Sequence, residues 1–198
     1  NVTCGEGGAI ITNDQNIYER VIQSVLHGMS ASAADRFKEG KYNHRGMEYL
    51  GTKANLPDLL ACLLPEQVKS IDSNISIREE KAQFYFSKLK NTKLRFPQEK
   101  SNINHSRHLF PIGVGMQKRD EILQILSSKN IGVTVNYRAV PTMNFYKNKY
   151  SIPNENIMNS FLWGEETISL PLFPDITSNE QDYIVKVLLD EVIPMIGN

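Results

Sequence analysis

The sequence predicts an α/β fold. Short apolar runs bounded by turn residues, typical of strands, alternate with stretches whose apolar residues recur every three to four positions, typical of helices. The length supports this prediction, because a chain of 198 residues buries roughly 70% of the surface that its unfolded form exposes. We therefore expect strands and helices packed in layers around a hydrophobic core.

The N-terminal part predicts a strand, a helix and a long loop. The apolar run Ala9–Thr12 is followed by turn residues, which favours a strand. From Ile17 the apolar residues repeat with helical spacing up to Gly28, a residue type that often ends a helix. Residues 30–49 are polar and show no period, which predicts a long loop.

A long helix is expected in the middle of the chain. Pro57 and Asp58 suit the first turn of a short helix, because proline lacks the N–H that is unpaired there and an acid favours the positive end of the helix dipole. Pro65 should kink or break this helix. A second helix, from about Glu66 to Lys90, has its apolar residues roughly on one stripe and is expected to bridge two lobes.

The C-terminal part alternates strands and helices, as expected for an α/β layer structure. One stretch, rich in aromatic residues and lysine, is expected to be a loop. In chain order we expect a strand at 109–114, a helix at 119–128, a strand at 131–135, the loop at 141–156, a helix at 157–165, a strand at 168–171 and a helix at 179–193.

The composition excludes several classes of function. Lys+Arg and Asp+Glu number 22 each, so the net charge is zero, unlike the basic surface of nucleic-acid-binding proteins. No apolar run reaches the ~18 residues of a membrane-spanning helix, and the first residues lack the basic and apolar regions typical of a signal peptide. Two cysteines are too few for a disulfide framework, and Cys62 is expected to be buried. We expect a cytoplasmic protein that binds neither nucleic acid nor membranes.

Two stretches have compositions that suit a bound ligand. The glycines between Gly5 and Gly8 allow positive φ angles and close approach of a ligand, although a tight turn explains them more simply. Lys53 and Asn55 precede the helix expected at Pro57, where a cation, an amide and free helix N–H groups would suit a phosphate. A capped helix with a solvated lysine is the alternative.

Polar residues also follow the strand expected at 131–135. Asn136, Tyr137 and Arg138 stand where residues often line a site, and exposed loop polarity explains them equally well. His105 and His108 have no cysteine or carboxylate at ligand spacing, so we expect no metal site.

Taken in order, several stretches resemble the DegT/StrS-type nucleotide-sugar aminotransferases. These are pyridoxal-phosphate (PLP) enzymes of fold type I, and the resemblance covers nearly the whole chain. The stretches that carry it are NVTCGEGGAIITND at 1–14, LHGM at 26–29, GTKANLPDLLACLL at 51–64, HLFPIGV at 108–114, NIGVTVNYRAVP at 130–141 and ISLPLFPDIT at 168–177.

The resemblance implies a domain organisation. In the family, the stretch similar to residues 1–14 follows the catalytic lysine, so the Schiff-base lysine is expected immediately before Asn1 and not in this chain. Residues 1–64 would then be the end of the PLP-binding large domain with a cofactor and dimer loop. Residues 65–95 would be a bridging helix, and residues 96–198 a small C-terminal α/β domain.

The resemblance also implies an activity. The enzyme would transfer an amino group from an amino acid, usually glutamate in this family, to a keto sugar nucleotide for amino-sugar or polysaccharide biosynthesis. The stretches GTKANLPD and NYRAVP look closest to members that act on a 4-keto hexose. Active sites shared between two subunits imply a homodimer.

Site residues follow from the same resemblance. Lys53 and Asn55 match the positions that reach the cofactor phosphate of the neighbouring subunit, and Gly7 should lie beside the cofactor. The stretch near the sugar usually begins with His, which Asn replaces here; Asn cannot carry a proton at neutral pH, so only a hydrogen-bonding role is expected. The expected substrate-binding residues are Asn136, Tyr137 and Arg138.

Two alternatives stay open at this point. Relatives of the same fold use PLP to dehydrate sugars, with His in place of the catalytic lysine. A non-catalytic dimerisation or binding domain is the second alternative, if these 198 residues are the whole protein. The residue before Asn1 distinguishes transfer from dehydration.

Overall fold

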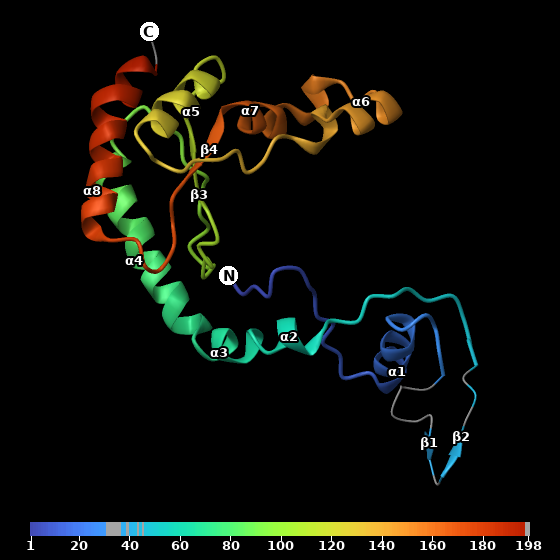
Figure 1. Cartoon of the computed structure of the whole chain (residues 1–198). Coiled ribbons are helices and arrows are strands. Elements are labelled where there is room, and N and C mark those ends of the chain that lie inside the picture. Colours follow the sequence, from blue (N-terminus) through green and yellow to red (C-terminus); the bar gives the residue numbers. More distant parts are fainter. Residues whose placement is uncertain (31–36, 39, 43, 45, 197–198) are drawn as a thin grey trace. The chain divides into compact units, whose positions relative to one another are not determined.

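The chain forms two compact units (Figure 1). The computed structural model describes residues 1–30, 37–38, 40–42, 44 and 46–196. The N-terminal unit is residues 2–70, and the C-terminal unit is residues 71–198 together with Asn1. The assignment of a large-domain part, a bridging helix and a small domain stays a prediction.

The N-terminal unit contains the helix expected from Ile17. This helix, α1, begins where the Asp14 carboxylate accepts hydrogen bonds from the backbone N–H groups of Asn16 and Ile17, at 2.8 and 3.2 Å. Such a cap satisfies donors that have no partner within the helix. The unit's elements are α1 (Gln15–Ser24), β1 (Phe37–Lys38), β2 (Lys41–Tyr42), α2 (Asp58–Ala61) and α3 (Leu64–Lys69).

The strand expected at 9–12 is wrong. Ile11 is 95% exposed, and no strand of the described residues lies beside this stretch. A strand needs a neighbour for its N–H and C=O groups, so an apolar run alone does not form one. Within the loop expected at 30–49, β1 and β2 form a short antiparallel pair, and residues 31–36, 39, 43 and 45 lie outside the described residues.

Pro57 marks a helix start, as expected, and the helix expected to be kinked or broken at Pro65 is broken, with a new helix beginning there. Pro57 precedes α2, and Pro65 stands in the first turn of α3. The helix expected from Glu66 is interrupted at Ser70, whose hydroxyl donates to the Glu66 carbonyl at 3.0 Å and so competes with the helical bonding pattern. Cys62, expected to be buried, is exposed, because α2 is a single turn whose residues remain largely uncovered.

The C-terminal unit is built around two antiparallel strands. Phe110 pairs with Leu170 and Gly113 pairs with Thr167. The elements of this unit are α4 (Ile71–Leu89), β3 (Phe110–Gly113), α5 (Arg119–Ser128), a 3-10 turn (Val140–Thr142), α6 (Asn144–Tyr150), a 3-10 turn (Asn154–Ile157), α7 (Met158–Glu166), β4 (Thr167–Leu170), α8 (Ser178–Val187), a π-helical turn (Leu188–Val192) and a 3-10 turn (Ile193–Met195).

Single bridges widen this sheet on both sides. Arg95 pairs with Gly113 of β3, and Thr134 pairs with Ser169 of β4. The strand expected at 131–135 is therefore reduced to one bridge, and the loop expected at 141–156 contains α6. The sequence of α6 has no apolar period because the whole helix is exposed.

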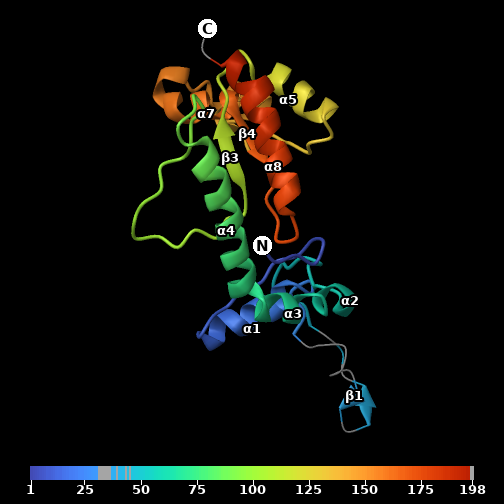
Figure 2. The same cartoon turned by 90° about the vertical axis from the view of Figure 1, so that its left-hand side faces the viewer.

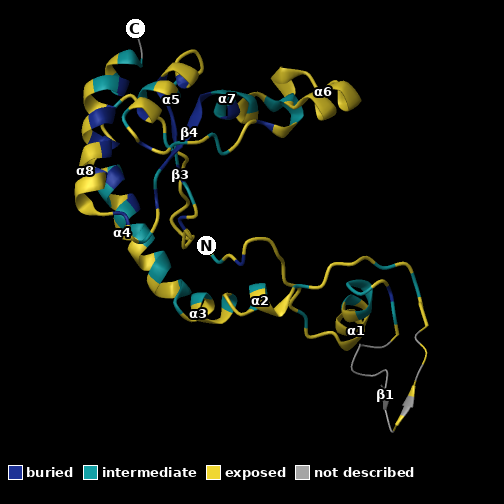
Figure 3. Ribbon diagram, in the orientation of Figure 1, coloured by how far each residue is buried: buried dark blue, intermediate teal, exposed yellow. Residues whose placement is uncertain are grey.

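The core of the C-terminal unit lies between the sheet and its helices. Figure 2 shows α8 beside α4, and the Gln181 side-chain amide of α8 donates to the Lys81 carbonyl of α4 at 3.0 Å. Figure 3 shows the buried faces of these helices and of the strands. Fully buried core side chains include Tyr85, Leu89, Ile112, Ile122, Leu126, Ile168 and Leu188.

Among the described residues, none of the helices combines the length and the apolar character needed to cross a bilayer.

Truncating a core side chain should destabilise the protein. Leu126 of α5 is fully buried, so Leu126→Ala should lower the free energy of unfolding by about 3 kcal/mol. Leu189, which is exposed, is the matched control, and Leu189→Ala should change it by less than ~1 kcal/mol. Urea denaturation of both variants measures the difference; equal losses would contradict this description of the core.

Candidate functional site

The backbone around Lys53 is held against the end of α1. The N–H of Thr52 donates to the Ser24 carbonyl at 2.8 Å, and the N–H of Ala54 donates to the Val25 carbonyl at 2.9 Å. These bonds come from the residues on either side of Lys53, so its backbone position is fixed from both sides.

The side chains of Lys53 and Asn55 meet. The Lys53 ammonium donates to the Asn55 amide oxygen, and both side chains are exposed. In the described part of the chain, no carboxylate forms an ion pair with Lys53. A positive charge without a carboxylate partner, next to an amide, is an arrangement that an anion such as a phosphate can bind.

Gly7 is packed closely against two side chains, which would have to move to admit a larger residue. A Cβ atom there would lie 2.8 Å from the Cys4 sulfur and 3.3 Å from a methyl group of Leu56. The glycine therefore lets the 4–7 turn pack closely on the residue that follows Asn55. The structure thus brings the three predicted cofactor-binding residues into one region of the N-terminal unit, and their contact with a cofactor stays a prediction.

The predicted substrate residues follow the bridge between Thr134 and β4. Tyr137 is 65% exposed, and the peptide bond between Asn136 and Tyr137 is cis. An Arg138 guanidinium nitrogen lies 3.7 Å from a carboxylate oxygen of Glu165 in α7. The three consecutive side chains therefore belong to one stretch beside β4, with Tyr137 and Arg138 accessible to a ligand.

Close packing by α7 positions this stretch. A Cβ atom at Gly164 would lie only 2.5 Å from the backbone nitrogen of Ala139, so the glycine lets the helix touch the backbone after Arg138. Arg119 of α5 donates to the Gly164 carbonyl at 2.8 Å and so links α5 to α7. The position of Arg138 thus depends on two helices.

Asn136 carries a buried acceptor without a partner. Its side-chain oxygen is inaccessible to solvent and accepts no hydrogen bond from the described residues. An unsatisfied buried polar atom costs roughly 1–3 kcal/mol. Because this oxygen is closed to solvent in the structure, the substrate-binding role expected for Asn136 stays a prediction.

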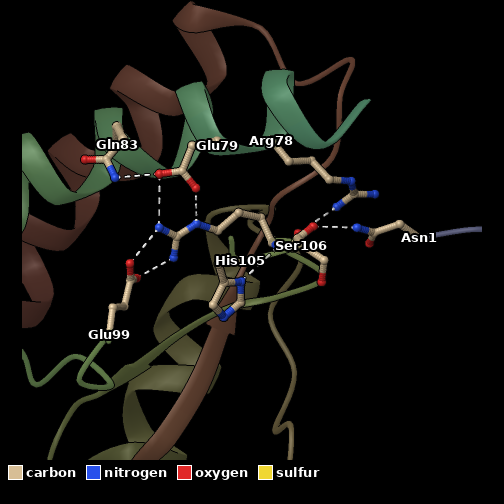
Figure 4. Close-up of polar contacts among 8 residues, drawn as sticks. Asn1, Arg78, Glu79, Gln83, Glu99, His105 and Ser106 are labelled. Carbon is tan, nitrogen blue, oxygen red and sulfur yellow. Dashed lines mark hydrogen bonds and ion pairs between the residues drawn. The ribbon is translucent and has the colours of Figure 1, made fainter. Parts of the chain in front are cut away.

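A second polar cluster, centred on Arg107, was missed by sequence reasoning (Figure 4). Arg107 is 4% exposed and forms ion pairs with Glu79 of α4 and with Glu99. Its Nη2 atom donates to Glu79 at 3.1 Å and to Glu99 at 2.8 Å. No short motif announces this cluster, because its members come together only when the loop before β3 folds against α4.

These ion pairs change the acidity of the groups. Burial by itself lowers the pKa of Arg107, but the hydrogen bonds to Glu99 and Glu79 outweigh burial and raise it above its ordinary value. The hydrogen bond from Arg107 is the main reason that the pKa of Glu79 lies below its ordinary value. Arg107 and Glu79 are therefore both charged at neutral pH.

Arg78 joins the Arg107 turn to the segment after β4. Its Nη1 atom donates to the Leu172 carbonyl at 2.8 Å and to the Arg107 carbonyl at 3.3 Å. Tyr85, two turns further along α4, donates to the Pro171 carbonyl at 3.1 Å. The amide of Asn1 donates to the Ser106 carbonyl (Figure 4). One face of α4 thus fixes two loops of the C-terminal unit.

The described residues contain no group of three His, Cys, Asp or Glu side chains that could hold a metal ion. His105 belongs to no such group, and its Nδ1 atom accepts a hydrogen bond from the backbone N–H of Arg107 at 2.9 Å.

Comparison with protein families decides the classification. The profile of the DegT/DnrJ/EryC1/StrS aminotransferase family matches residues 1–189. The chain belongs to this family. The match covers both units and every predicted site residue, and it agrees with the resemblance noted in the sequence.

Solved structures of aminotransferases share the fold. The PLP-form of Spr1654, described as a sugar aminotransferase from Streptococcus pneumoniae, is 22% identical, with a TM-score of 0.79 over 96% of this chain and 47% of its own. PseC of Helicobacter pylori, an aminotransferase involved in the biosynthesis of pseudoaminic acid, is 20% identical, with a TM-score of 0.76 over 93% of this chain and 48% of its own. DesV of S. venezuelae is 19% identical, with a TM-score of 0.76 over 90% and 44%.

This member of the DegT/DnrJ/EryC1/StrS family spans slightly less than half the length of these three proteins. The predicted fold class, an α/β C-terminal part of a fold type I transferase, is confirmed. The assignment of individual residues to cofactor and substrate stays a prediction.

The Arg107 cluster predicts a pH-dependent contribution to stability. Because the folded-state pKa of Glu79 lies below its ordinary value of 4.5, its ion pair stabilises the fold above that pH and loses this effect as the pH falls through the folded-state pKa. Glu79→Gln should therefore be less stable than the unaltered protein at pH 7, and the difference should shrink below about pH 4.5.

Urea denaturation from pH 3 to pH 8 measures this difference. Glu80→Gln is the matched control, because Glu80 is the next residue on α4, is exposed and forms no ion pair in the described part of the chain. A Glu79→Gln difference that is the same at every pH would exclude the ion pair as its cause.

Proposed function

We propose that this chain is the C-terminal part of a PLP-dependent enzyme that moves an amino group from an amino acid, glutamate, to a keto sugar nucleotide, a 4-keto hexose. The observation that carries the proposal is the family match over residues 1–189. Support comes from the likeness to sugar aminotransferases, one of them solved in PLP-form and PMP-form. The product would serve amino-sugar or polysaccharide biosynthesis in the cytoplasm.

The N-terminal unit would bind the cofactor. PLP, when bound, supplies the electron sink for moving the amino group. The Lys53 ammonium and the Asn55 amide would bind its phosphate, which fits a cation that no carboxylate of the described residues neutralises. Gly7 would keep the 4–7 backbone beside the cofactor, because a side chain there would push this turn away from Leu56.

The stretch beside β4 would bind the substrate. The Asn136 side chain, whose oxygen has no partner among the described residues, would turn outward and accept a hydrogen bond from the sugar. The exposed ring of Tyr137 would pack against the sugar. Arg138 would attract the phosphates of the nucleotide, since its distance to Glu165 leaves its guanidinium able to form another ion pair. Asn136 would orient the substrate without transferring a proton.

The active assembly would be a homodimer with shared sites. In this proposal Lys53 and Asn55 reach the cofactor of the neighbouring subunit, and the Schiff-base lysine immediately precedes Asn1. Each site then needs residues from two subunits, so a monomer would be inactive.

The proposal is tested on the full-length protein. After loading with PLP, addition of glutamate should shift the cofactor's visible absorbance and release one 2-oxoglutarate per site. A nucleotide-linked 4-keto hexose should then restore the original spectrum and yield the amino sugar, which mass spectrometry detects. Absence of both spectral changes would refute an aminotransferase.

Replacing Lys53 should weaken cofactor retention. Lys53→Ala removes the charge proposed to bind the phosphate, so the affinity for PLP should fall by roughly tenfold. The fraction of sites that still hold PLP after dialysis should fall with it. Lys53→Arg should retain part of the binding, and Lys90→Ala, at another exposed lysine, should have no effect. Unchanged occupancy in Lys53→Ala would remove Lys53 from the phosphate site.

Replacing Asn136 should weaken substrate use. Asn136→Ala deletes the buried acceptor, so kcat/KM for the keto sugar nucleotide should fall by about tenfold. Asn91→Ala, at an exposed position away from β4, is the control. Steady-state kinetics with fixed glutamate measure the effect, and equal kcat/KM values in both variants would show that Asn136 does not touch the sugar.

A further inference from the structure

The helix α6 and the residues around it form an exposed aromatic surface. Every residue from 143 to 156 is exposed (Figure 3). Phe145 is 66% exposed and Tyr150 is 55% exposed, and Tyr146 stands between them on the same helix. Single exposed aromatics are common, but three in one short helix make a patch that usually marks a binding surface. We call Phe145, Tyr146, Lys147, Lys149 and Tyr150 the α6 surface.

The α6 surface is also positively charged. Residues 137–154 contain Arg138, Lys147 and Lys149 and no acidic residue, although the chain as a whole is neutral. In the described part of the chain neither lysine forms an ion pair. The Lys149 ammonium lies 5.5 Å from the centre of the Phe145 ring and 5.3 Å from that of the Tyr150 ring. Rings and charges therefore share one face.

The aromatic rings and positive charges of the α6 surface together indicate which kind of ligand binds there. A second copy of the α6 surface would bring lysines against lysines, which disfavours contact across a two-fold axis. A purely apolar partner would leave the two ammonium groups unpaired. A ligand with a planar ring and a separate anionic group satisfies both features, because the ring stacks on an aromatic side chain while the anionic group pairs with lysine.

We propose that the α6 surface binds the nucleoside diphosphate portion of the substrate. The base would stack on Tyr150 or Phe145, and the diphosphate would pair with Lys147 and Lys149 in addition to Arg138. The inference rests on the proposed function, since it takes the substrate to be a sugar nucleotide.

The chain order suits this arrangement. The 3-10 turn at Val140–Thr142 joins the stretch with Asn136 and Arg138 to α6. Figure 1 shows α6 beyond α7, away from the β3–β4 sheet. The sugar would therefore lie near Asn136, and the nucleotide would extend past Arg138 to α6.

Calorimetry on the full-length protein tests the inference. The probes are UDP, dTDP, GDP and ADP, with uridine and inorganic pyrophosphate as partial ligands. At least one diphosphate should bind. The double variant Phe145→Ala/Tyr150→Ala should weaken its binding by about tenfold or more, and Tyr150→Phe should retain it. Pyrophosphate binding should be insensitive to these ring substitutions.

Lysine variants separate charge from stacking. Lys147→Gln/Lys149→Gln should weaken diphosphate binding and reduce its dependence on salt concentration, since salt screens exposed charges. Lys88→Gln is the matched control, because Lys88 also lies over a ring, that of Phe84, on α4. Tyr18→Ala, at another exposed tyrosine, is the control for the rings. Both controls should bind normally.

Three results would overturn the inference. One is that none of the four diphosphates binds, and another is that the α6 variants bind them as the unaltered protein does. The third is that Tyr146 and Tyr150 are already protected from hydroxyl-radical oxidation without nucleotide, because another part of the assembly then covers the surface. Glutamate-dependent release of 2-oxoglutarate uses no nucleotide, so it reports separately whether the proposed function fails.

Discussion

The pairing of β3 with β4 is the constraint on which the C-terminal unit depends. Its register brings Ile112 and Ile168 together in the core, between α4, α8 and the shorter helices. The bridge from Thr134 to Ser169 continues the same sheet, and it places Asn136 beside the beginning of β4. The position of the candidate substrate residues therefore follows from strand pairing. The register of this pairing is fixed because one face of the sheet is buried against the helices.

Elements with strong local signals could be predicted from the sequence. The helix at 119–128 has an apolar stripe, and it was placed at the bounds that α5 has in the structure. The prolines at 57 and 65 marked helix starts, because a missing N–H acts locally and needs no distant partner. The contact between Lys53 and Asn55 is local in the same way, because a single residue separates them along the backbone, and their binding role stays a prediction.

Features that depend on distant partners could not be predicted. The run at 9–12 is apolar enough for a strand, but only a neighbouring strand would make it one. The surroundings of Arg107 include Glu79 on α4, and nothing in the composition of either stretch shows that they meet. The exposed helix α6 was missed because the usual signal of a helix is an apolar face that it buries, and α6 buries none.

The absence of a side chain at Gly164 determines which substitutions α7 and the stretch after Asn136 can accept. Even alanine there would push α7 away from the backbone that carries Arg138, and no rotamer change could relieve the overlap because the neighbouring atom is a backbone nitrogen. Substitutions could enlarge or reshape the candidate binding residues after Asn136 without disturbing the core, but only while position 164 stays glycine. Changes in what this region binds would then come from the side chains that project outward, while α7 behind them keeps its position.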